Sequence, residues 1–385
     1  MMKCYNDNRL QIVKENMGKI LNVEINSGVD DSYNIVIEPD FIKLADILSV
    51  VFATCNKFML VFDSNTDGYF KDEVSRLLSS TKKMVSSFTF TAGEDNKNLT
   101  TVYKLYEKLI KEKFERNDVI LAVGGGVVGD LAGFSAATYL RGIRFAQIPT
   151  TLLAMSDSSV GGKTGVDFLS YKNMVGAFHQ PKLVYMNVNT LISLPEREYI
   201  SGMAEVIKYG YIYDKEFIDY LRDNANKVLD KDYSTLEYII FHSCRIKKEV
   251  VEKDPLEDGL RAILNYGHTI GHAVEKLMEF KLLHGECVAI GMMSAARIAL
   301  SRGLMSEEEF SDMKDILVSF KLFRRIILSE TAFSKEDILT ATKSDKKMQG
   351  GRIKFVLTTE IGRAEIYRDV TDEELMLGIN EVFEG

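Results

Sequence analysis

The first half of the chain alternates short apolar runs with segments of helical periodicity. Strand-like and helix-like segments follow one another in this order: 57–65, 69–80, 84–90, 99–114, 118–126 and 129–140. Strands that alternate with helices usually pair in parallel. The pattern therefore predicts an α/β domain with a Rossmann-like parallel sheet and helices on both of its faces.

Two more strand-like runs, 144–153 and 182–187, continue this pattern, and the glycine-rich stretch 159–168 between them is predicted to be a loop or hairpin. From about residue 194 the apolar positions recur with helical spacing, with hardly a strand before a late pair at 352–359 and 363–370. We therefore expect two domains, an α/β domain at 1–193 and a mainly α-helical domain at 194–385.

Composition narrows the class of protein. Of 385 residues, 46% are hydrophobic and 27% are charged, as in a soluble globular protein. The polar N-terminus is unlike a signal peptide, and no later run is apolar for long enough to span a membrane, so a cytoplasmic location is expected. The four cysteines lie far apart, which indicates reduced thiols. A net charge of −8 argues against a nucleic-acid partner, although local basic pockets remain compatible with it.

The stretch VILAVGGGVVGDLAGF, beginning at Val119, is a candidate phosphate-binding turn. An apolar strand ends in Gly124, Gly125 and Gly126, and a helix is expected to begin near Gly129 and Asp130. Glycines let a phosphate approach the backbone, and a helix N-terminus offers free N–H groups. A tight turn that binds nothing is the alternative, because the acidic residue usual about 20 positions later is missing.

Two neighbouring loops favour the binding hypothesis. Asp63 and Asn65 follow an earlier strand, and Glu94 and Lys97 lie in the loop after the next one. The carboxyl ends of parallel strands meet at one edge of an α/β sheet, where ligands bind. A dinucleotide is the expected ligand of these three loops.

The glycine-rich stretch at 156–173 contains Asp157, Lys163, Lys172 and Asn173. Lysines on such a loop can bind a phosphate or a carboxylate. The spacing does not fit a P-loop, and taken alone these lysines are better explained as the surface of an ordinary hairpin.

Three of the five histidines, His268, His272 and His284, lie in one short window. His268 and His272 are four residues apart and hence lie on one helix face. Both could bind one metal ion, or one could bind it while the other acts beside it. This spacing lacks the glutamate of HExxH, which disfavours a zinc hydrolase. Glu205, in an apolar helix with Lys208 one turn on, could supply a further ligand, and three protein ligands with an open position are typical of catalytic zinc. Histidines that only form hydrogen bonds are the alternative.

Gly267 and Gly271 flank His268 and are expected to keep the histidine face open. Upstream, Lys247, Arg261 and Asn265 are candidate donors to an anion, although Lys247 could equally be ordinary helix surface. Lys346 and Lys347 would by themselves indicate only a solvated turn.

Several long strings resemble the 3-dehydroquinate synthase family of the sugar phosphate cyclase superfamily: GGGVVGDLAGFSAATYLRGI, QIPTTLLAMSDSSVGGKTGV, KNMVGAFHQPK, GMAEVIKYG, GLRAILNYGHTIGHAVE, LHGE and DKK. The resemblance extends from about residue 63 to about residue 361. It implies an N-terminal NAD-binding domain, a C-terminal helical metal-binding domain, an active site in the cleft between them, and a homodimer.

The resemblance also implies roles for individual residues. The metal ligands would be Glu205, His268 and His284. The NAD contacts would be Asp63, Asn65, Glu94, Lys97, Gly125, Gly126, Val127, Asp130, Thr150, Thr151 and Lys172. The substrate contacts would be Arg141, Asp157, Lys163, Asn173, Lys208, Lys247, Arg261, Asn265, His272, Lys346 and Lys347. Proton transfer would fall to Glu257 and His272. Departures from the family pattern lie at 167–171, which reads DFLSY, and at His179.

The family implies conversion of 3-deoxy-D-arabino-heptulosonate 7-phosphate into 3-dehydroquinate and phosphate, a step of the shikimate pathway towards aromatic amino acids. NAD would oxidise the substrate transiently beside one divalent metal ion, zinc or cobalt. β-Elimination of phosphate, reduction and an intramolecular aldol closure would follow. Arg141 would come from the partner subunit.

Three alternatives remain open. A sister cyclase, such as 2-deoxy-scyllo-inosose synthase or a valiolone-type synthase, would share the fold, NAD and metal. A metal-dependent polyol dehydrogenase would release NADH and commonly uses an aspartate and three histidines. A non-catalytic NAD-binding protein would have no need of the substrate cations.

Overall fold

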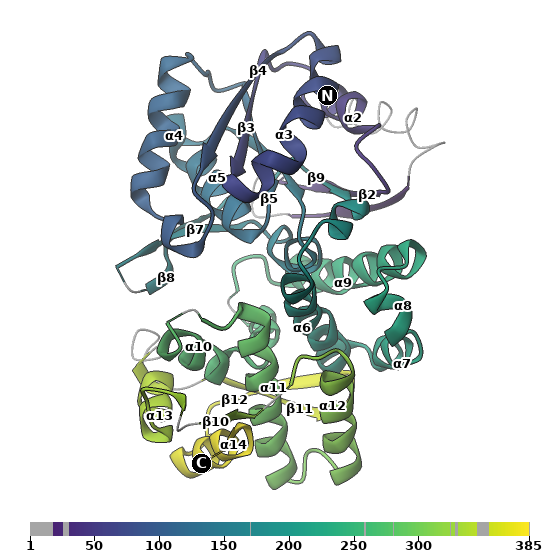
Figure 1. The fold of residues 1–385 in the computed structure, drawn as a ribbon, viewed down its shortest axis with the longest axis vertical. Helices are drawn as coiled ribbons and strands as arrows, with labels where there is room; N and C mark the ends of the chain where they lie inside the picture. The colour runs from purple at the N-terminus through teal and green to yellow at the C-terminus, as the bar shows by residue number, and fades with distance from the viewer. Residues whose placement is uncertain are drawn as a thin grey trace. The chain divides into compact units, whose positions relative to one another are not determined.

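The computed structural model describes residues 18–25, 31–169, 171–257, 259–279, 281–323, 325–327, 330–344 and 354–384 (Figure 1). The chain forms two compact units: Met1–Leu194 with Leu236–Leu256, and Pro195–Thr235 with Glu257–Gly385. Lys346 and Lys347 lie outside the described residues. Among the described residues, no helix has the length and apolar character needed to cross a bilayer.

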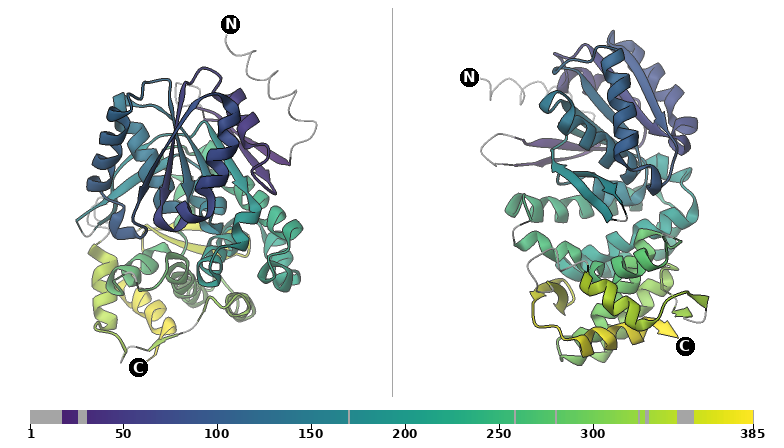
Figure 2. Two further views of the ribbon diagram at one scale, coloured as in Figure 1. Left: turned by 45° about the horizontal axis from the view of Figure 1, so that its top comes forward. Right: turned by 90° about the vertical axis from the view of Figure 1, so that its left-hand side faces the viewer.

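A seven-stranded sheet forms the centre of the first unit (Figure 2). Its strands, in spatial order, are β1 (Lys19–Val23), β2 (Tyr33–Glu38), β9 (Leu183–Asn187), β6 (Arg144–Pro149), β5 (Val119–Gly124), β3 (Lys57–Asp63) and β4 (Met84–Phe90). All neighbouring strands are parallel except β1 and β2. The predicted α/β fold with a mostly parallel sheet is confirmed, and the antiparallel edge strand β1 is an addition to it.

Helices cover both faces of this sheet, as predicted: α2 (Leu44–Val51), α3 (Ser64–Leu78), α4 (Leu99–Lys111) and α5 (Gly126–Thr138). Strand β3 shows the period of two that places side chains alternately on the two faces. Phe58 and Leu60 join the core beneath α2 and α3, whereas Met59 and Val61 join the core beneath α4 and α5. The continuous apolar run of β3 is thus explained by burial on both sides.

Residues 159–168, expected to be a loop or hairpin, contribute to a hairpin of β7 (Lys163–Phe168) and β8 (Tyr171–Phe178). The hairpin is antiparallel and β7 packs against α5.

Helix α9 (Tyr233–Lys253) lies mostly in the first unit, although the sequence pattern placed it in the helical domain. Its partners explain this. The Cys244 thiol donates to the carbonyl oxygen of Met155 at 3.2 Å, and Lys247 pairs with Asp157. Helical periodicity identifies a helix but does not reveal which core receives its buried face.

The second unit is mainly helical, as predicted. Its helices are α6 (Glu196–Tyr213), α7 (Lys215–Asp223), α8 (Ala225–Leu229), α10 (His268–Leu277), α11 (His284–Ser301), α12 (Glu307–Ser319), α13 (Lys335–Ser344) and α14 (Asp372–Val382). The late strand pair is present as antiparallel β11 (Phe355–Glu360) and β12 (Arg363–Tyr367), and β10 (Ile326–Ile327) pairs with β13 (Phe383–Glu384). Helix α11 packs against α6, α10, α12 and α14 and is the centre of this unit.

Helices α10 and α11 approach each other through glycine. A Cβ at Gly291 would overlap the carbonyl oxygen of Gly267, and a Cβ at Gly271 would lie 2.7 Å from the carbonyl oxygen of Cys287. The prediction that Gly267 and Gly271 keep a face open is therefore wrong. These positions are closed against α11, and glycine is needed there because backbone lies where a side chain would be.

We expect Gly291→Ala to lower the free energy of unfolding by about 3 kcal/mol, because the added methyl group forces α10 and α11 apart. Denaturant unfolding followed by circular dichroism measures this. Gly68→Ala is the matched control, since a Cβ there meets nothing within 4 Å. In an exposed helix this change should be neutral or stabilising by about 0.5–1 kcal/mol. Equal stability of both variants would contradict the proposed close contact.

Candidate metal centre and active site

Three helices of the second unit bring a carboxylate and two imidazoles together. Glu205 lies on α6, His268 is the first residue of α10 and His284 is the first residue of α11. One possible ligand atom from each lies within 4.8 Å of the others. The Nε2 atoms of His268 and His284 are each 3.5 Å from Oε1 of Glu205. Residues that are remote in sequence thus meet in the arrangement the histidine window suggested.

His268 is held in the form that binds metal ions. Its Nδ1 lies 3.0 Å from the carbonyl oxygen of Tyr266, which can only accept, so Nδ1 carries the hydrogen and Nε2 keeps its lone pair. Burial, reinforced by the nearby Lys208 ammonium, lowers the pKa of His268 to about 3. The ring is therefore neutral at physiological pH, as a ligand must be.

Glu205 is buried next to a cation. Its carboxylate forms an ion pair with Lys208, one helical turn on, and each of the two residues is 1% exposed. A buried carboxylate needs such compensation, because leaving water costs it several kcal/mol. Two imidazole nitrogens and one carboxylate oxygen match the donor set of catalytic zinc or cobalt sites, so the residues present fit a divalent metal ion.

Glu275 belongs to this centre although the sequence reasoning missed it. This α10 residue is 3% exposed, and its Oε1 lies 3.5 Å from Nδ1 of His284. Burial alone would lower the pKa of His284, but Glu205 and Glu275, on either side of the ring, raise it to about 9, so a metal ion that bound this ring would displace its proton. Helical spacing could have revealed Glu275, because it follows His272 by three residues and so lies on the same face.

His272 differs from its two neighbours. Its side chain is exposed, and its ring centroid lies 5.2 Å from that of His268 and 5.9 Å from that of His284. It can form a second group with Glu275 and His284, but it is not in the group that contains Glu205. This geometry leaves His272 available to solvent and to a ligand.

Glu257, Arg261 and Asn265 lie in the segment that leads into α10. Asn265 donates from Nδ2 to Oε1 of Glu257 at 3.0 Å. Arg261, 1% exposed, lies with Asn265 in a short 3₁₀ helix, Leu260–Asn265. The structure thus joins Asn265 and Glu257 directly and buries Arg261 in the same short helix as Asn265.

In the first unit, Lys247 of α9 is joined to Asp157. The Lys247 ammonium donates to both the Oδ1 and the carbonyl oxygen of Asp157, each at 2.7 Å. Asp157 lies in a single π-helical turn, Ala154–Ser158, a local geometry that is frequent at functional sites. Lys247 is 5% exposed, so it is not the ordinary surface lysine that the alternative assumed.

The glycine turn after β5 leads directly into a helix. Helix α5 begins at Gly126 with Gly125 as its N-cap, so the expectation of a start near Gly129 and Asp130 is wrong by one turn. Gly129 lies inside the helix, where a Cβ would meet the Gln147 side chain at 2.5 Å. The free N–H groups therefore belong to the first turn, which includes Val127. This bare backbone at a helix N-terminus fits the pyrophosphate of a dinucleotide.

Around this turn lie the other residues predicted to bind NAD. Lys97, 3% exposed, is 2.7 Å from Oδ2 of Asp130 and 3.5 Å from Oε1 of Glu94. Burial alone would lower the pKa of Lys97, but the two carboxylates outweigh it and raise that pKa. Burial raises the pKa of Asp130, although Lys97 opposes this effect.

The remaining predicted residues of the first unit lie at strand ends and on the hairpin. Asp63 caps α3 by accepting the backbone N–H groups of Asn65 and Thr66. Thr150 and Thr151 follow β6, and the Thr150 N–H donates to the carbonyl oxygen of Gly124 at 3.0 Å.

Lys163, Lys172 and Asn173 lie on the β7–β8 hairpin. Arg141 is exposed after α5, with a left-handed backbone (φ 65°). His179 stacks on Phe145 with ring centroids 5.3 Å apart. This contact gives His179 a packing role rather than a place among the predicted ligand contacts.

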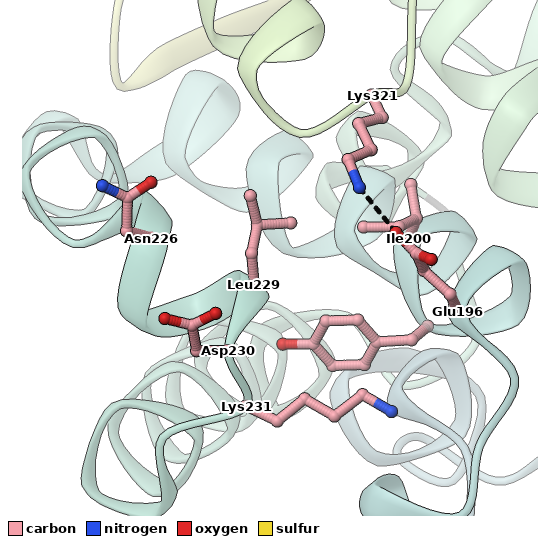
Figure 3. A pocket seen from close by; sticks show the side chains of 8 residues that line it. Glu196, Ile200, Asn226, Leu229, Asp230, Lys231 and Lys321 are labelled. Carbon is pink, nitrogen blue, oxygen red and sulfur yellow. Dashed lines mark hydrogen bonds and ion pairs between the residues drawn. The ribbon is translucent and has the colours of Figure 1, made fainter.

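A separate hollow of about 520 Å³ lies between α6, α8 and Lys321 (Figure 3). An ion pair of 2.6 Å between Lys321 and Glu196 borders it, and the Lys231 ammonium lies over the Tyr199 ring. None of the predicted site residues that the structure describes lines this hollow. The hollow is therefore separate from the group of Glu205, His268 and His284.

Comparison with known proteins identifies the family. The family model described as 3-dehydroquinate synthase N-terminal matches residues 87–201, and the one described as 3-dehydroquinate synthase C-terminal matches residues 202–348. A protein of Ruminiclostridium cellulolyticum named 3-dehydroquinate synthase is 47% identical over 90% of this chain and 94% of its own length.

The solved structures of two sister cyclases are similar to this chain over more than nine tenths of its length. A 2-deoxy-scyllo-inosose synthase complexed with carbaglucose-6-phosphate, NAD+ and Co2+ is 26% identical, with a TM-score of 0.85 over 95% of this chain and 100% of its own. A 2-epi-5-epi-valiolone synthase from Streptomyces hygroscopicus subsp. jinggangensis, with NAD+ and Zn2+ bound, is 25% identical, with a TM-score of 0.83 over 91% and 96%. Since the family models cover most of the chain and the sequence relative matches nearly all of it, this chain belongs to the 3-dehydroquinate synthase family.

Proposed function

We propose that this chain converts 3-deoxy-D-arabino-heptulosonate 7-phosphate into 3-dehydroquinate and phosphate, using NAD and one divalent metal ion, zinc or cobalt. The observation that carries the proposal is the group of Glu205, His268 and His284, whose ligand atoms lie within 4.8 Å of one another, in a chain of this family. When bound, the metal ion supplies Lewis acidity and NAD a reversible oxidant, so the overall reaction is redox-neutral.

Glu205, His268 and His284 would hold the metal ion and leave coordination positions open for the substrate. Lys208 would keep the Glu205 carboxylate in place through their ion pair. Glu275 would hold the His284 ring from its other nitrogen, an arrangement that fixes tautomer and orientation in many metal sites.

Proton transfer would use groups that are near the metal ligands without being ligands. His272 is exposed beside His268, so it can reach a substrate atom and exchange protons with solvent. Glu257 would be the second proton-transfer residue, and by accepting the Asn265 amide at 3.0 Å it would also orient that donor.

The substrate carries a phosphate and a carboxylate, which require cationic partners. Arg141, Lys163, Asn173, Asn265 and His272 would bind the phosphate, whereas Lys247 and Arg261 would bind the carboxylate. Asp157 would set the direction of the Lys247 ammonium through its two 2.7 Å contacts. Cations concentrated in one site explain how a protein of net charge −8 can bind an anion.

The main rival is a sister cyclase substrate, because the similar solved structures include such enzymes. Two observations favour the heptulosonate phosphate. A relative named 3-dehydroquinate synthase is 47% identical, against 25–26% for the two sister cyclases. The buried cations Lys247 and Arg261 also suit a substrate that carries a carboxylate group.

The proposal also covers the roles of the two domains, the location of the protein and its oligomeric state. We place NAD on the domain at 1–193 and the metal ion on the domain at 194–385, and we expect a cytoplasmic homodimer in which Arg141 acts in the partner's active site. Size-exclusion chromatography with light scattering measures the oligomeric state.

The reaction itself gives the first test. Purified protein with zinc or cobalt, catalytic NAD and the heptulosonate phosphate should release phosphate and form the carbocyclic product in equal amounts, without net NADH. Phosphate assay, mass spectrometry and absorbance at the NADH band measure these. Absence of phosphate release, or one NADH per substrate, would contradict the proposed function.

The division of labour among the histidines gives a second prediction. His268→Ala should lose the metal ion and all turnover, whereas His272→Ala should keep the metal ion and lose rate by about 10²–10⁴-fold, the usual contribution of a general acid or base. Metal content by mass spectrometry and steady-state kinetics measure these outcomes. Equal metal loss in both variants would overturn the assignment.

Glu275 gives a third prediction. We expect Glu275→Gln to weaken metal binding about 10–100-fold, the range found when a carboxylate behind a histidine ligand is removed. Competition with a chromophoric chelator measures this without any catalytic assay. Glu279→Gln is the control, because the Glu279 side chain is 81% exposed. Unchanged metal affinity in Glu275→Gln would show that His284 is oriented without it.

A further inference from the structure

The β7–β8 hairpin contains an irregularity opposite Asp167. Val166 pairs with Val175 and Phe168 pairs with Tyr171, so one residue on β7 faces three on β8. These three are Lys172, Asn173 and Met174. A bulge of this kind bends a strand and redirects side chains, and bulges are frequent next to active sites. Two of the three bulged residues are the ones assigned to NAD and substrate binding.

Asn173 adopts a backbone conformation that needs support. Its φ is 51°, in the left-handed region that non-glycine residues seldom occupy. Its N–H points back across the hairpin and donates to Oδ1 of Asp167 at 2.8 Å. The Asp167 carboxylate thus accepts a hydrogen bond from an N–H group that would bind the opposite strand in a regular hairpin. This contact requires the bulged backbone conformation.

The backbone of Asp167 is attached to a second cofactor loop. Its N–H donates to the carbonyl oxygen of Lys97 at 2.8 Å, and residue 167 forms an isolated parallel bridge with Asn98. The Lys97 side chain in turn pairs with Asp130 in the second turn of α5. Asp167 therefore connects the bulge to the loop after β4 and, through Lys97, to the glycine turn.

A shared carboxylate completes the connection. Oε1 of Glu94 lies 3.5 Å from the Lys97 ammonium and 3.6 Å from the Lys172 ammonium. Lys172 therefore lies over the same loop to which Asp167 is attached. The side chain of Asp167 is only partly buried, so the contact forms at the protein surface where a ligand can reach Lys172 and Asn173.

We propose that Asp167 is a positioning residue for Lys172 and Asn173. Its carboxylate accepts the Asn173 N–H, while its own backbone N–H donates to the carbonyl oxygen of Lys97 and so attaches it to the loop after β4. Lys172 is thereby presented to NAD and Asn173 to the substrate. The assignment of these two ligands rests on the proposed function, but the positioning contact itself does not. It also gives a physical role to the first residue of the segment 167–171, where the sequence departs from its family.

The test compares Asp167→Ala, which removes the acceptor, with Asp167→Asn, which keeps an oxygen acceptor and removes the charge. The first measurement is the amide proton shift of Asn173 in protein labelled with 15N-asparagine, with the signal assigned by its loss in Asn173→Gln. The second is the dissociation constant of NAD by calorimetry, and the third is KM for the heptulosonate phosphate.

In Asp167→Ala we expect the Asn173 amide signal to move upfield. We also expect NAD affinity to fall and KM to rise, each by about tenfold, which is the size expected when a hydrogen bond to an ionised group is lost. Asp167→Asn should show an intermediate amide shift and return both constants to within about threefold of the wild type. Asp40→Ala is the matched control, because Asp40 accepts the Ile42 N–H at 2.8 Å in the same unit. It should change neither the Asn173 signal nor the binding constants.

An unchanged Asn173 signal in Asp167→Ala would overturn the proposal. So would binding constants in Asp167→Asn as poor as those in Asp167→Ala, because charge rather than the acceptor would then be responsible. If the alanine variant does not fold, the amide shift of Asp167→Asn still decides, since an amide acceptor must alter it. A wild-type protein without synthase activity would refute the proposed function, whereas the amide signal would still report on the positioning contact.

Discussion

The buried carboxylate of Glu205 is the constraint on which the active-site half of this protein depends. A charge at a side chain 1% exposed is tolerable only if cations or strong donors surround it, and α6 and α11 supply these as Lys208 and His284. The close glycine contacts between α10 and α11 allow two helices to begin at the same place. Packing and electrostatics therefore require the same arrangement.

Much of this arrangement could be predicted from the sequence. The apolar runs of β3, β5, β6 and β9 predicted these strands because each of the four is buried on both faces. The spacing of His268 and His272 placed them on one helix face. The start of α5 was missed by one turn, because periodicity does not show where the first N–H groups become free. The role of Gly271 was misjudged, because the neighbouring backbone that makes glycine necessary comes from α11, later in the chain.

Other features depend on contacts that no local pattern contains. Helical spacing places Glu275 on the face of His272, but its contact with His284 appears only when the fold brings α11 beside α10. Asp167 resembles a hairpin residue until the bulge is seen, because the register shift depends on how the two strands pair. Helix α9 carries helical periodicity like its neighbours, and only its contacts with Met155 and Asp157 assign it to the first unit. In each case the missing information is a tertiary contact.

The dispersal of Glu205, His268 and His284 along the chain has a consequence for folding. A single ion held by all three would close two long loops at once, and it could bind tightly only after α6, α10 and α11 had assembled. The ion would then act as a cross-link confined to the helical unit, adding about 2.7 kcal/mol to its stability at a concentration 100 times the dissociation constant. The α/β unit, which lacks these ligands, would gain nothing directly. Metal supply would therefore set the lifetime of one half of the protein as well as its activity.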